Sequence, residues 1–255
     1  MQGEVRLSVA DGVAELLLDR AAKHNAMTPA MAAQLATHAR AIDADDEARA
    51  VLVRGEGARA FCSGSDLNSL AAYASAWHFR NRVEYAAALR GIRKPVVAAL
   101  QGWTLGGGAE MALGADYRIA AFGTRIGFPE VQRGWVGGGG ASQLLPRLIG
   151  HAAATRLLML AEPIEAEEAL RLGLVHEVVA PEALLPRARE VAAKLAGFSP
   201  VAVQSVKAAL RAAMESSLSA GIAYENEMNV LCFSAGDHLE GIRAFNEKRP
   251  AEFSR

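Results

Sequence analysis

Two glutamates stand where a carboxyl group could exchange protons with a substrate. Glu110 lies among apolar residues, two positions after the last glycine of the run at 106–108. Apolar surroundings disfavour the charged form of a carboxyl group, so we expect a raised pKa that suits proton transfer. Glu130 follows Pro129 at a predicted strand-to-loop transition. The alternative interpretation of Glu110 is a carboxylate that only caps a glycine-rich helix start or faces water.

The glycines ahead of Glu110 are typical of a backbone site for a developing negative charge. Residues 106–108 carry no Cβ, so the chain can turn tightly there and approach a ligand. The helix expected after them begins with free N–H groups and a partial positive charge. The loop Ser63-Gly64-Ser65 would present a second N–H, at Ser65, beside this turn. The simpler interpretation is a loop in which Asp66 is a helix N-cap.

No nucleophile is indicated near this loop. The pattern around Ser65 is not GxSxG, and no His/Asp pair is placed near it, so we do not expect a catalytic serine. Cys62 has no activating base in view, and we expect it to be a small apolar filler.

The elements that must position these residues are predicted from apolar patterns and turn signals. Residues 95–100 form a short apolar run that suits a strand buried on both faces. Asp11-Gly12 joins two apolar runs as a hairpin, and Thr28-Pro29 supplies the N-cap and first residue of a helix. Aromatic residues over 71–93 predict a further helix, in which most of them belong to the core.

The pattern changes near Phe198, from mixed β and α segments to helices alone. We therefore predict an α/β core over residues 1–197 and a helical region over residues 198–255. The last segment keeps Leu239 and Phe245 among charged residues. An amphipathic tail of this kind needs another surface to cover it, such as a second subunit.

The overall composition argues against several classes of protein. The chain has 255 residues, of which 51% are hydrophobic, and a net charge of −1. Phosphate binding favours a basic surplus, so nucleic acid is not the expected partner. The two cysteines form no CxxC pair or metal cluster, which favours a reducing compartment. With no signal-peptide core and no run long enough to cross a bilayer, we expect a soluble cytoplasmic protein without membrane contact.

Short motifs run through the chain in a fixed order. They are residues 60–67 (AFCSGSDL), 94–99 (KPVVAA) with Gly102, 105–110 (LGGGAE) with Asp116, 128–130 (FPE), Gly134 with 137–140, 166–169 (AEEA) with 173–175, and 240–241 with Phe245 and 247–249. No single motif is decisive. Their order and spacing together resemble the enoyl-CoA hydratase/isomerase (crotonase) superfamily over essentially the whole length.

The resemblance implies an α/β fold, a crotonase-like spiral of β-β-α turns, with a C-terminal helical trimerisation region that makes a homotrimer or a dimer of trimers. It implies an acyl-CoA substrate, no metal and no cofactor, since coenzyme A is part of the substrate. Matching positions place the oxyanion hole at the backbone N–H groups of Ser65 and Gly107. They assign water activation to Glu110 and protonation of the α-carbon to Glu130, a pair that favours a hydratase.

The resemblance also implies a set of substrate-binding positions. Those carried over are Ala60, Cys62, Ser63, Asp66, Leu67 and Gly106. Lys23 and Lys248 are candidates for holding coenzyme A, with ordinary exposed lysines as the alternative. Trp103 and Trp135 stand near the expected acyl site, where they either reshape the pocket or pack beneath it. Family hydratases often carry proline where Gly137 stands.

Two other functions stay open on the residues alone. The nearer is an acyl-CoA isomerase, or another reaction of the same superfamily, that uses one of the two acids; product analysis separates it from hydration. The farther is a non-catalytic binding protein on the same fold, with an RNA or protein partner. The near-neutral charge and the presence of both acids weigh against the second alternative.

Overall fold

The computed structural model describes residues 3–70 and 73–253 and arranges its strands in two sheets. The larger sheet has the order β1 (Glu4–Ala10), β2 (Val13–Asp19), β3 (Ala50–Gly55), β5 (Val96–Leu100), β7 (Tyr117–Ala121) and β10 (Glu177–Val179). The smaller has the order β4 (Ala60–Cys62), β6 (Trp103–Leu105), β8 (Arg125–Gly127) and β9 (Ile164–Glu165). The pairs β1/β2 and β8/β9 are antiparallel, and the other neighbours run parallel.

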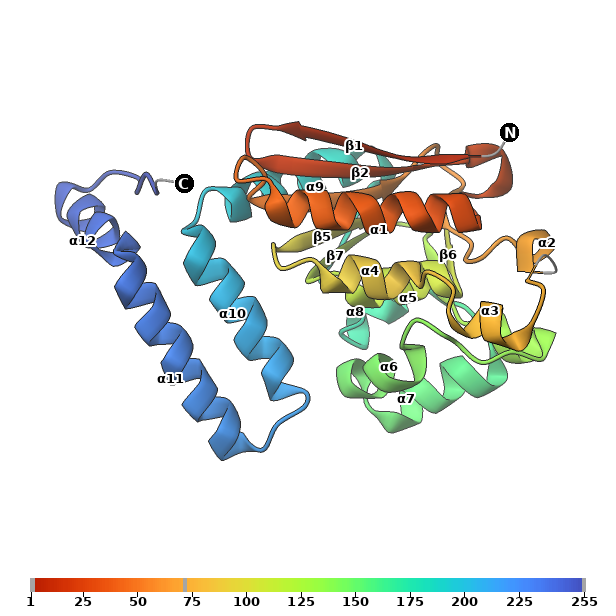
Figure 1. Ribbon diagram of the computed structural model, residues 1–255. Coiled ribbons are helices and arrows are strands. Elements are labelled where there is room, and N and C mark those ends of the chain that lie inside the picture. The colour runs from red at the N-terminus through yellow and green to blue at the C-terminus, as the bar shows by residue number, and fades with distance from the viewer. Residues whose placement is uncertain (1–2, 71–72, 254–255) are drawn as a thin grey trace.

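From β3 to β8, consecutive strands alternate between the two sheets, and this alternation makes the chain a spiral (Figure 1). β3, β5 and β7 lie in the larger sheet, and each is followed by a strand of the smaller one, β4, β6 or β8. Helices then carry the chain back, among them α4 (Tyr85–Gly91) after β4 and α5 (Gly107–Gly114) after β6. The predicted spiral of β-β-α turns is confirmed.

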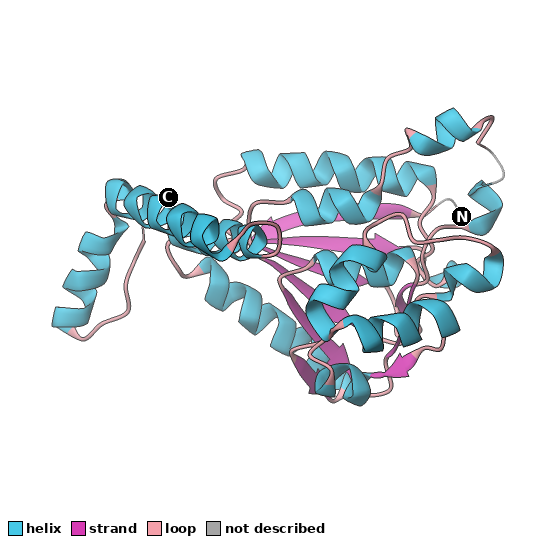
Figure 2. Cartoon of the chain, turned by 90° about the horizontal axis from the view of Figure 1, so that it is seen from below, coloured by secondary structure: helices cyan, strands magenta, loops and turns pink. Residues whose placement is uncertain are grey.

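The central strand β5 is buried on both faces, as predicted. Val96, Ala98 and Leu100 belong to a core that includes side chains of α1 (Pro29–Ala44) and α4. The alternate side chains, Val97 and Ala99, pack with α9 (Leu184–Ala196) on the other face. Figure 2 shows the strands between these helical layers.

The predicted hairpin and helix start are confirmed in their local geometry. Asp11 and Gly12 both have positive φ, 51° and 79°, in the turn between β1 and β2. Helix α1 begins at Pro29, and the Thr28 side chain accepts a hydrogen bond from the backbone N–H of Met31 at 3.2 Å. The remaining short helices are α2 (Leu67–Leu70), α6 (Ala141–Ile149), α7 (His151–Thr155), α8 (Ala166–Arg171), the 3₁₀ turns Ala21–Lys23, Pro129–Arg133 and Pro181–Ala183, and the π turn Arg156–Leu160.

The single helix predicted over residues 71–93 is wrong. Residues 71–72 lie outside the described part, and the rest divides into α3 (Ala76–Arg80) and α4. The carboxylate of Glu84 accepts hydrogen bonds from two backbone N–H groups of α4, so it begins a new helix there. Trp77 on α3 is 67% exposed, so the expected core role fails for it, whereas Tyr85 and Leu89 of α4 are buried.

The C-terminal helices α10 (Pro200–Ala213), α11 (Leu218–Ala235) and α12 (Asp237–Glu247) extend away from the sheets (Figure 1). Buried Lys207 attaches α10 to the core: its Nζ lies 2.5 Å from an Asp116 carboxylate oxygen and donates to the Lys94 carbonyl at 2.7 Å. The core–helix boundary between residues 197 and 198 stays a prediction. Among the described residues, no helix combines the length and apolar character needed to cross a membrane.

Candidate active site

The carboxyl ends of three neighbouring strands carry the candidate site. β4, β6 and β8 run parallel in the smaller sheet, with Leu105 at the end of β6 paired with Gly127 at the end of β8. Parallel strands end at one edge, so the segments that follow them lie together. Ser65 follows β4, Gly107 follows β6 and Glu130 follows β8. All three line one cavity of about 440 Å³.

Two backbone N–H groups in this cavity are free to bind a ligand. Within the described part of the chain, neither Ser65 nor Gly107 donates its N–H to another residue. Gly107 is the first residue of α5, so its N–H belongs to the unpaired first turn. A Cβ on Gly64 would stand 3.2 Å from the Gly107 nitrogen, so glycine keeps that donor uncrowded. Two such donors can stabilise negative charge that develops on one oxygen.

Glu110 is buried in the first turn of α5, which excludes the interpretation of a water-facing carboxylate. It is 3% exposed, and its Oε1 accepts hydrogen bonds from the backbone N–H groups of Gly139 at 2.9 Å and Ala141 at 3.0 Å. Burial raises the pKa of Glu110, and these hydrogen bonds oppose the rise. The loop before α6 therefore fixes the orientation of this acid.

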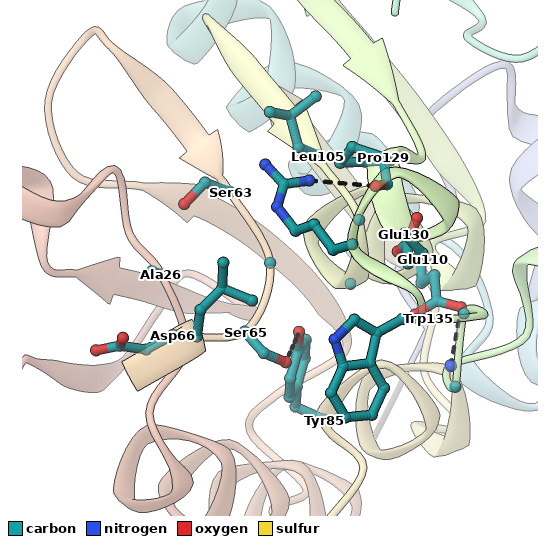
Figure 3. Close-up of a pocket in the computed structure, with 18 of the residues that line it drawn as sticks. Ala26, Ser63, Ser65, Asp66, Tyr85, Leu105, Glu110, Pro129, Glu130 and Trp135 are labelled. Carbon is teal, nitrogen blue, oxygen red and sulfur yellow. Dashed lines mark hydrogen bonds between the residues drawn. The ribbon is translucent and has the colours of Figure 1, made fainter. Parts of the chain in front are cut away.

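Glu130 faces the same cavity from the 3₁₀ turn after β8, beside Glu110 (Figure 3). A Cβ on Gly106 would lie 3.0 Å from its Oε1, so the missing side chain leaves room for the carboxyl group. Burial raises the pKa of Glu130, and the nearby charge of Glu110 raises it further. Two acids with raised pKa values at one cavity can divide the giving and taking of protons.

Six further predicted residues line this cavity. They are Lys23, Ser63, Asp66, Leu67, Gly106 and Trp135. The Trp135 ring packs against Phe79 with centroids 5.4 Å apart, so it forms part of the cavity wall. Asp66 accepts a hydrogen bond from the backbone N–H of Asn68 at 3.0 Å, as the N-cap interpretation expects.

The other four predicted substrate-binding residues are not among those that line the cavity. Ala60 and Cys62 are buried in β4, and burial raises the pKa of the Cys62 thiol to about 12. The Trp103 ring lies instead under the guanidinium of Arg125, whose Cζ is 5.3 Å from the centroid of the ring. Lys248 directly follows α12, a helix that lies on the opposite side of the molecule from α3 (Figure 1).

Sequence analysis missed several features that shape the cavity. The glycines at 137–140 form one of the motifs, yet nothing in the pattern tied them to Glu110, which accepts hydrogen bonds from the backbone N–H groups of Gly139 and Ala141. Tyr85 belongs to the core, as expected for the aromatic residues of this segment, but it also lines the cavity, and its hydroxyl lies 3.0 Å from the Ser65 Oγ. Only the tertiary fold brings these residues together, so no local signal could have found them.

Cations at the cavity suit a ligand that carries phosphate groups. The basic residues that line the cavity are Arg20, Lys23, Arg82 and Arg133. The Arg20 Nη1 also forms an ion pair with the Asp66 Oδ2, at 2.8 Å. Across the described ranges 3–70 and 73–253, no group of three or more His, Cys, Asp or Glu side chains could hold a metal ion.

Comparison with known proteins agrees with this geometry. A family profile described as enoyl-CoA hydratase/isomerase matches residues 8–255. The crotonyl-CoA hydratase of Syntrophomonas wolfei is 34% identical over 94% of each chain, and the short-chain-enoyl-CoA hydratase of Clostridium acetobutylicum is 37% identical over 83% of this chain and 82% of that one. The crystal structure of an enoyl-CoA hydratase from Bacillus anthracis matches with a TM-score of 0.93 at 32% identity, over 98% of each chain. The chain therefore belongs to the enoyl-CoA hydratase/isomerase family.

Proposed function

We propose that the protein is an enoyl-CoA hydratase, which adds water reversibly to a 2-enoyl-CoA thioester. The observation that carries the proposal is one cavity holding two free backbone N–H groups and two carboxyl groups with raised pKa values. The names of the relatives, crotonyl-CoA hydratase and short-chain-enoyl-CoA hydratase, support the same reaction.

Each part of the cavity has a role in this reaction. The oxygen of water bonds to the β-carbon, and the double-bond electrons move through the α-carbon onto the thioester oxygen. The N–H groups of Ser65 and Gly107 stabilise that enolate charge. Glu110 takes the proton that water loses, and Glu130 gives a proton to the α-carbon. The two roles exchange in dehydration. No further cofactor is proposed, because coenzyme A enters as part of the substrate.

The cavity walls support a substrate with one apolar and one anionic end. Leu67, Phe79, Trp135 and Val136 supply apolar side chains that suit an acyl chain. Lys23, on the same cavity, suits a phosphate group of coenzyme A. The contribution of Lys248 stays a prediction, because its own chain holds it away from this cavity.

We also propose that the chain assembles as a homotrimer or a dimer of trimers. Large apolar side chains on α10, α11 and α12 are exposed in the single chain, and such surfaces mark interfaces between proteins. A cytoplasmic location is proposed as well, which the cysteine usage of the sequence favours.

Addition of crotonyl-CoA to the purified protein tests the function. The ultraviolet absorbance of the conjugated thioester is expected to fall, and the product to be a 3-hydroxyacyl-CoA. Glu110→Gln and Glu130→Gln are each expected to keep the fold, shown by unchanged circular dichroism, and to lose about a hundredfold or more in turnover. A product whose double bond has only moved would identify an isomerase, and near-normal turnover of either variant would contradict that residue's role.

A further inference from the structure

The hydroxyl groups of Tyr85 and Ser65 form a pair beside the two candidate donors of the oxyanion hole. Their oxygens lie 3.0 Å apart, and both residues line the cavity. Figure 3 shows the two side chains meeting at the cavity. The Tyr85 ring is almost fully buried, so packing holds the phenol in place.

The phenol oxygen lies directly against Gly107. A Cβ built on Gly107 would overlap the Tyr85 hydroxyl oxygen and stand 2.8 Å from the ring carbon that carries it. In a helix the Cα–Cβ bond tilts toward the N-terminus, which is also the end at which the first-turn N–H groups are free. The hydroxyl lies against Gly107, whose own first-turn N–H is unpaired.

Counting protons leaves one donor unused in this pair. Each hydroxyl carries one proton, and a single hydrogen bond between them uses one of the two. Neither oxygen has another hydrogen-bond partner in the part of the chain that the structure describes. Burial raises the pKa of Tyr85 well above its ordinary value, so the phenol keeps its proton and stays a donor.

We propose that Tyr85, supported by Ser65, donates a third hydrogen bond to the thioester oxygen, alongside the N–H groups of Ser65 and Gly107. The Ser65 hydroxyl donates to the phenol oxygen and leaves the phenol proton free for the substrate. The phenol shares its proton with the enolate oxygen and does not transfer it. This inference rests on the proposed hydratase function and assigns Tyr85 a catalytic role within it.

The test compares Tyr85→Phe with wild type in two measurements. Removal of one oxyanion donor costs about a hundredfold or more in kcat, and a smaller change is expected in KM. The second measurement is the infrared carbonyl stretch of bound butyryl-CoA labelled with ¹³C at the thioester carbon, a saturated thioester that cannot be hydrated. Its frequency should be lower on wild type than in water, and Tyr85→Phe should move it back upward.

Two further variants serve as controls. Ser65→Ala keeps its backbone N–H and the phenol, so its carbonyl frequency should stay closer to wild type than that of Tyr85→Phe. Tyr117→Phe removes a hydroxyl that donates to Glu177 at 2.9 Å, and neither residue lines the cavity, so the frequency should not move. Should Tyr85→Phe fail to fold, 3,5-difluorotyrosine at position 85 replaces it. This residue has nearly the same shape and is a stronger donor, so it should lower the frequency further.

The outcomes separate this inference from the proposed function. Suppose that wild type hydrates crotonyl-CoA but that neither substitution at position 85 changes the carbonyl frequency. That result would overturn the role of Tyr85 and leave the hydratase function standing. If wild type lowers the carbonyl frequency, Tyr85→Phe reverses that change and no enoyl-CoA is hydrated, the hydratase function is contradicted. The role of Tyr85 as a third donor would then still stand.

Discussion

At the residue scale, the burial that suits Glu110 to its proposed role in proton transfer also lowers the stability of the fold. Burial raises its pKa in the folded protein, so folding penalises the ionised form. The folded protein therefore loses stability as the pH rises through that pKa, and a neutral isostere avoids the loss. The amide oxygen of a glutamine at position 110 can still accept the hydrogen bonds from the backbone N–H groups of Gly139 and Ala141. Active-site groups of this kind are commonly kept at the expense of stability.

Glu110→Gln is thus expected to raise the melting temperature at pH 7, although it lowers turnover by about a hundredfold or more. The expected gain is about 2–4 °C, which corresponds to about 1 kcal/mol of added stability in a chain of this size. Thermal unfolding followed by circular dichroism measures it at several pH values. The gain should shrink as the pH falls through the pKa of Glu110, because wild type becomes neutral there too. Lower stability of the variant at neutral pH would show that the carboxylate is a net stabilising group.

The acid side of the pH profile follows from the same two carboxyl groups. Hydration needs one of them ionised, and burial raises the pKa of both Glu110 and Glu130. As the pH falls, kcat/KM for crotonyl-CoA should therefore decline at a pH above the ordinary glutamate pKa of about 4.3. The two groups interact, so the measured value belongs to the pair. A decline that begins only below the ordinary value would contradict raised pKa values in the free enzyme.

At the scale of elements, the loop between the 3₁₀ turn Pro129–Arg133 and α6 orients Glu110, the proposed water-activating acid. A Cβ on Gly139 would stand 2.8 Å from both the Ala86 Cβ and the Glu110 Oε2. Because Ala86 lies within buried α4, the loop is the part that must move, and the Gly139 N–H moves with it. Glycine at position 139 thus serves close packing against Glu110 as well as turn flexibility.

Gly139→Ala is expected to lower kcat by roughly tenfold to a hundredfold, since small displacements of a catalytic group have effects of that size. Gly138→Ala in the same loop is the matched comparison, because a Cβ there meets only the flexible end of the Arg82 side chain. Steady-state kinetics with crotonyl-CoA should show a clearly smaller loss for Gly138→Ala. Equal losses would mean that loop flexibility, and not contact with Glu110, explains the need for glycine.

Sequence patterns predicted elements well where the signals were local. The Asp11-Gly12 turn, the Thr28 cap and the apolar strand β5 all depend on neighbours along the chain. The break between α3 and α4 was missed because aromatic spacing outweighed the capping signal of Glu84. The contacts of Glu110 with residues 139 and 141 join segments about thirty positions apart, and no local pattern encodes them.

At the scale of the whole molecule, the C-terminal helices have an apolar surface without a cover in the single chain. The exposed large apolar side chains are Val206, Leu210, Leu218, Ile222, Tyr224, Val230, Leu231, Phe233, Leu239, Ile242 and Phe245. Helix α11 contains no buried residue, although it carries many apolar ones. Leaving this surface in water is unfavourable, so burial against neighbouring copies would stabilise the helices themselves.

Phe245→Glu and Leu210→Glu should therefore weaken the assembly. Both side chains are more than half exposed, at 83% and 65%, so the changes disturb little packing within the chain. Light scattering after gel filtration should give a multiple of three chains for wild type and a smaller mass for the variants. Phe122→Glu is the control, because Phe122 is 66% exposed but follows β7, away from these helices. A wild type with the mass of one chain would contradict the proposed trimer. Variants that keep the wild-type mass would place the interface on another surface.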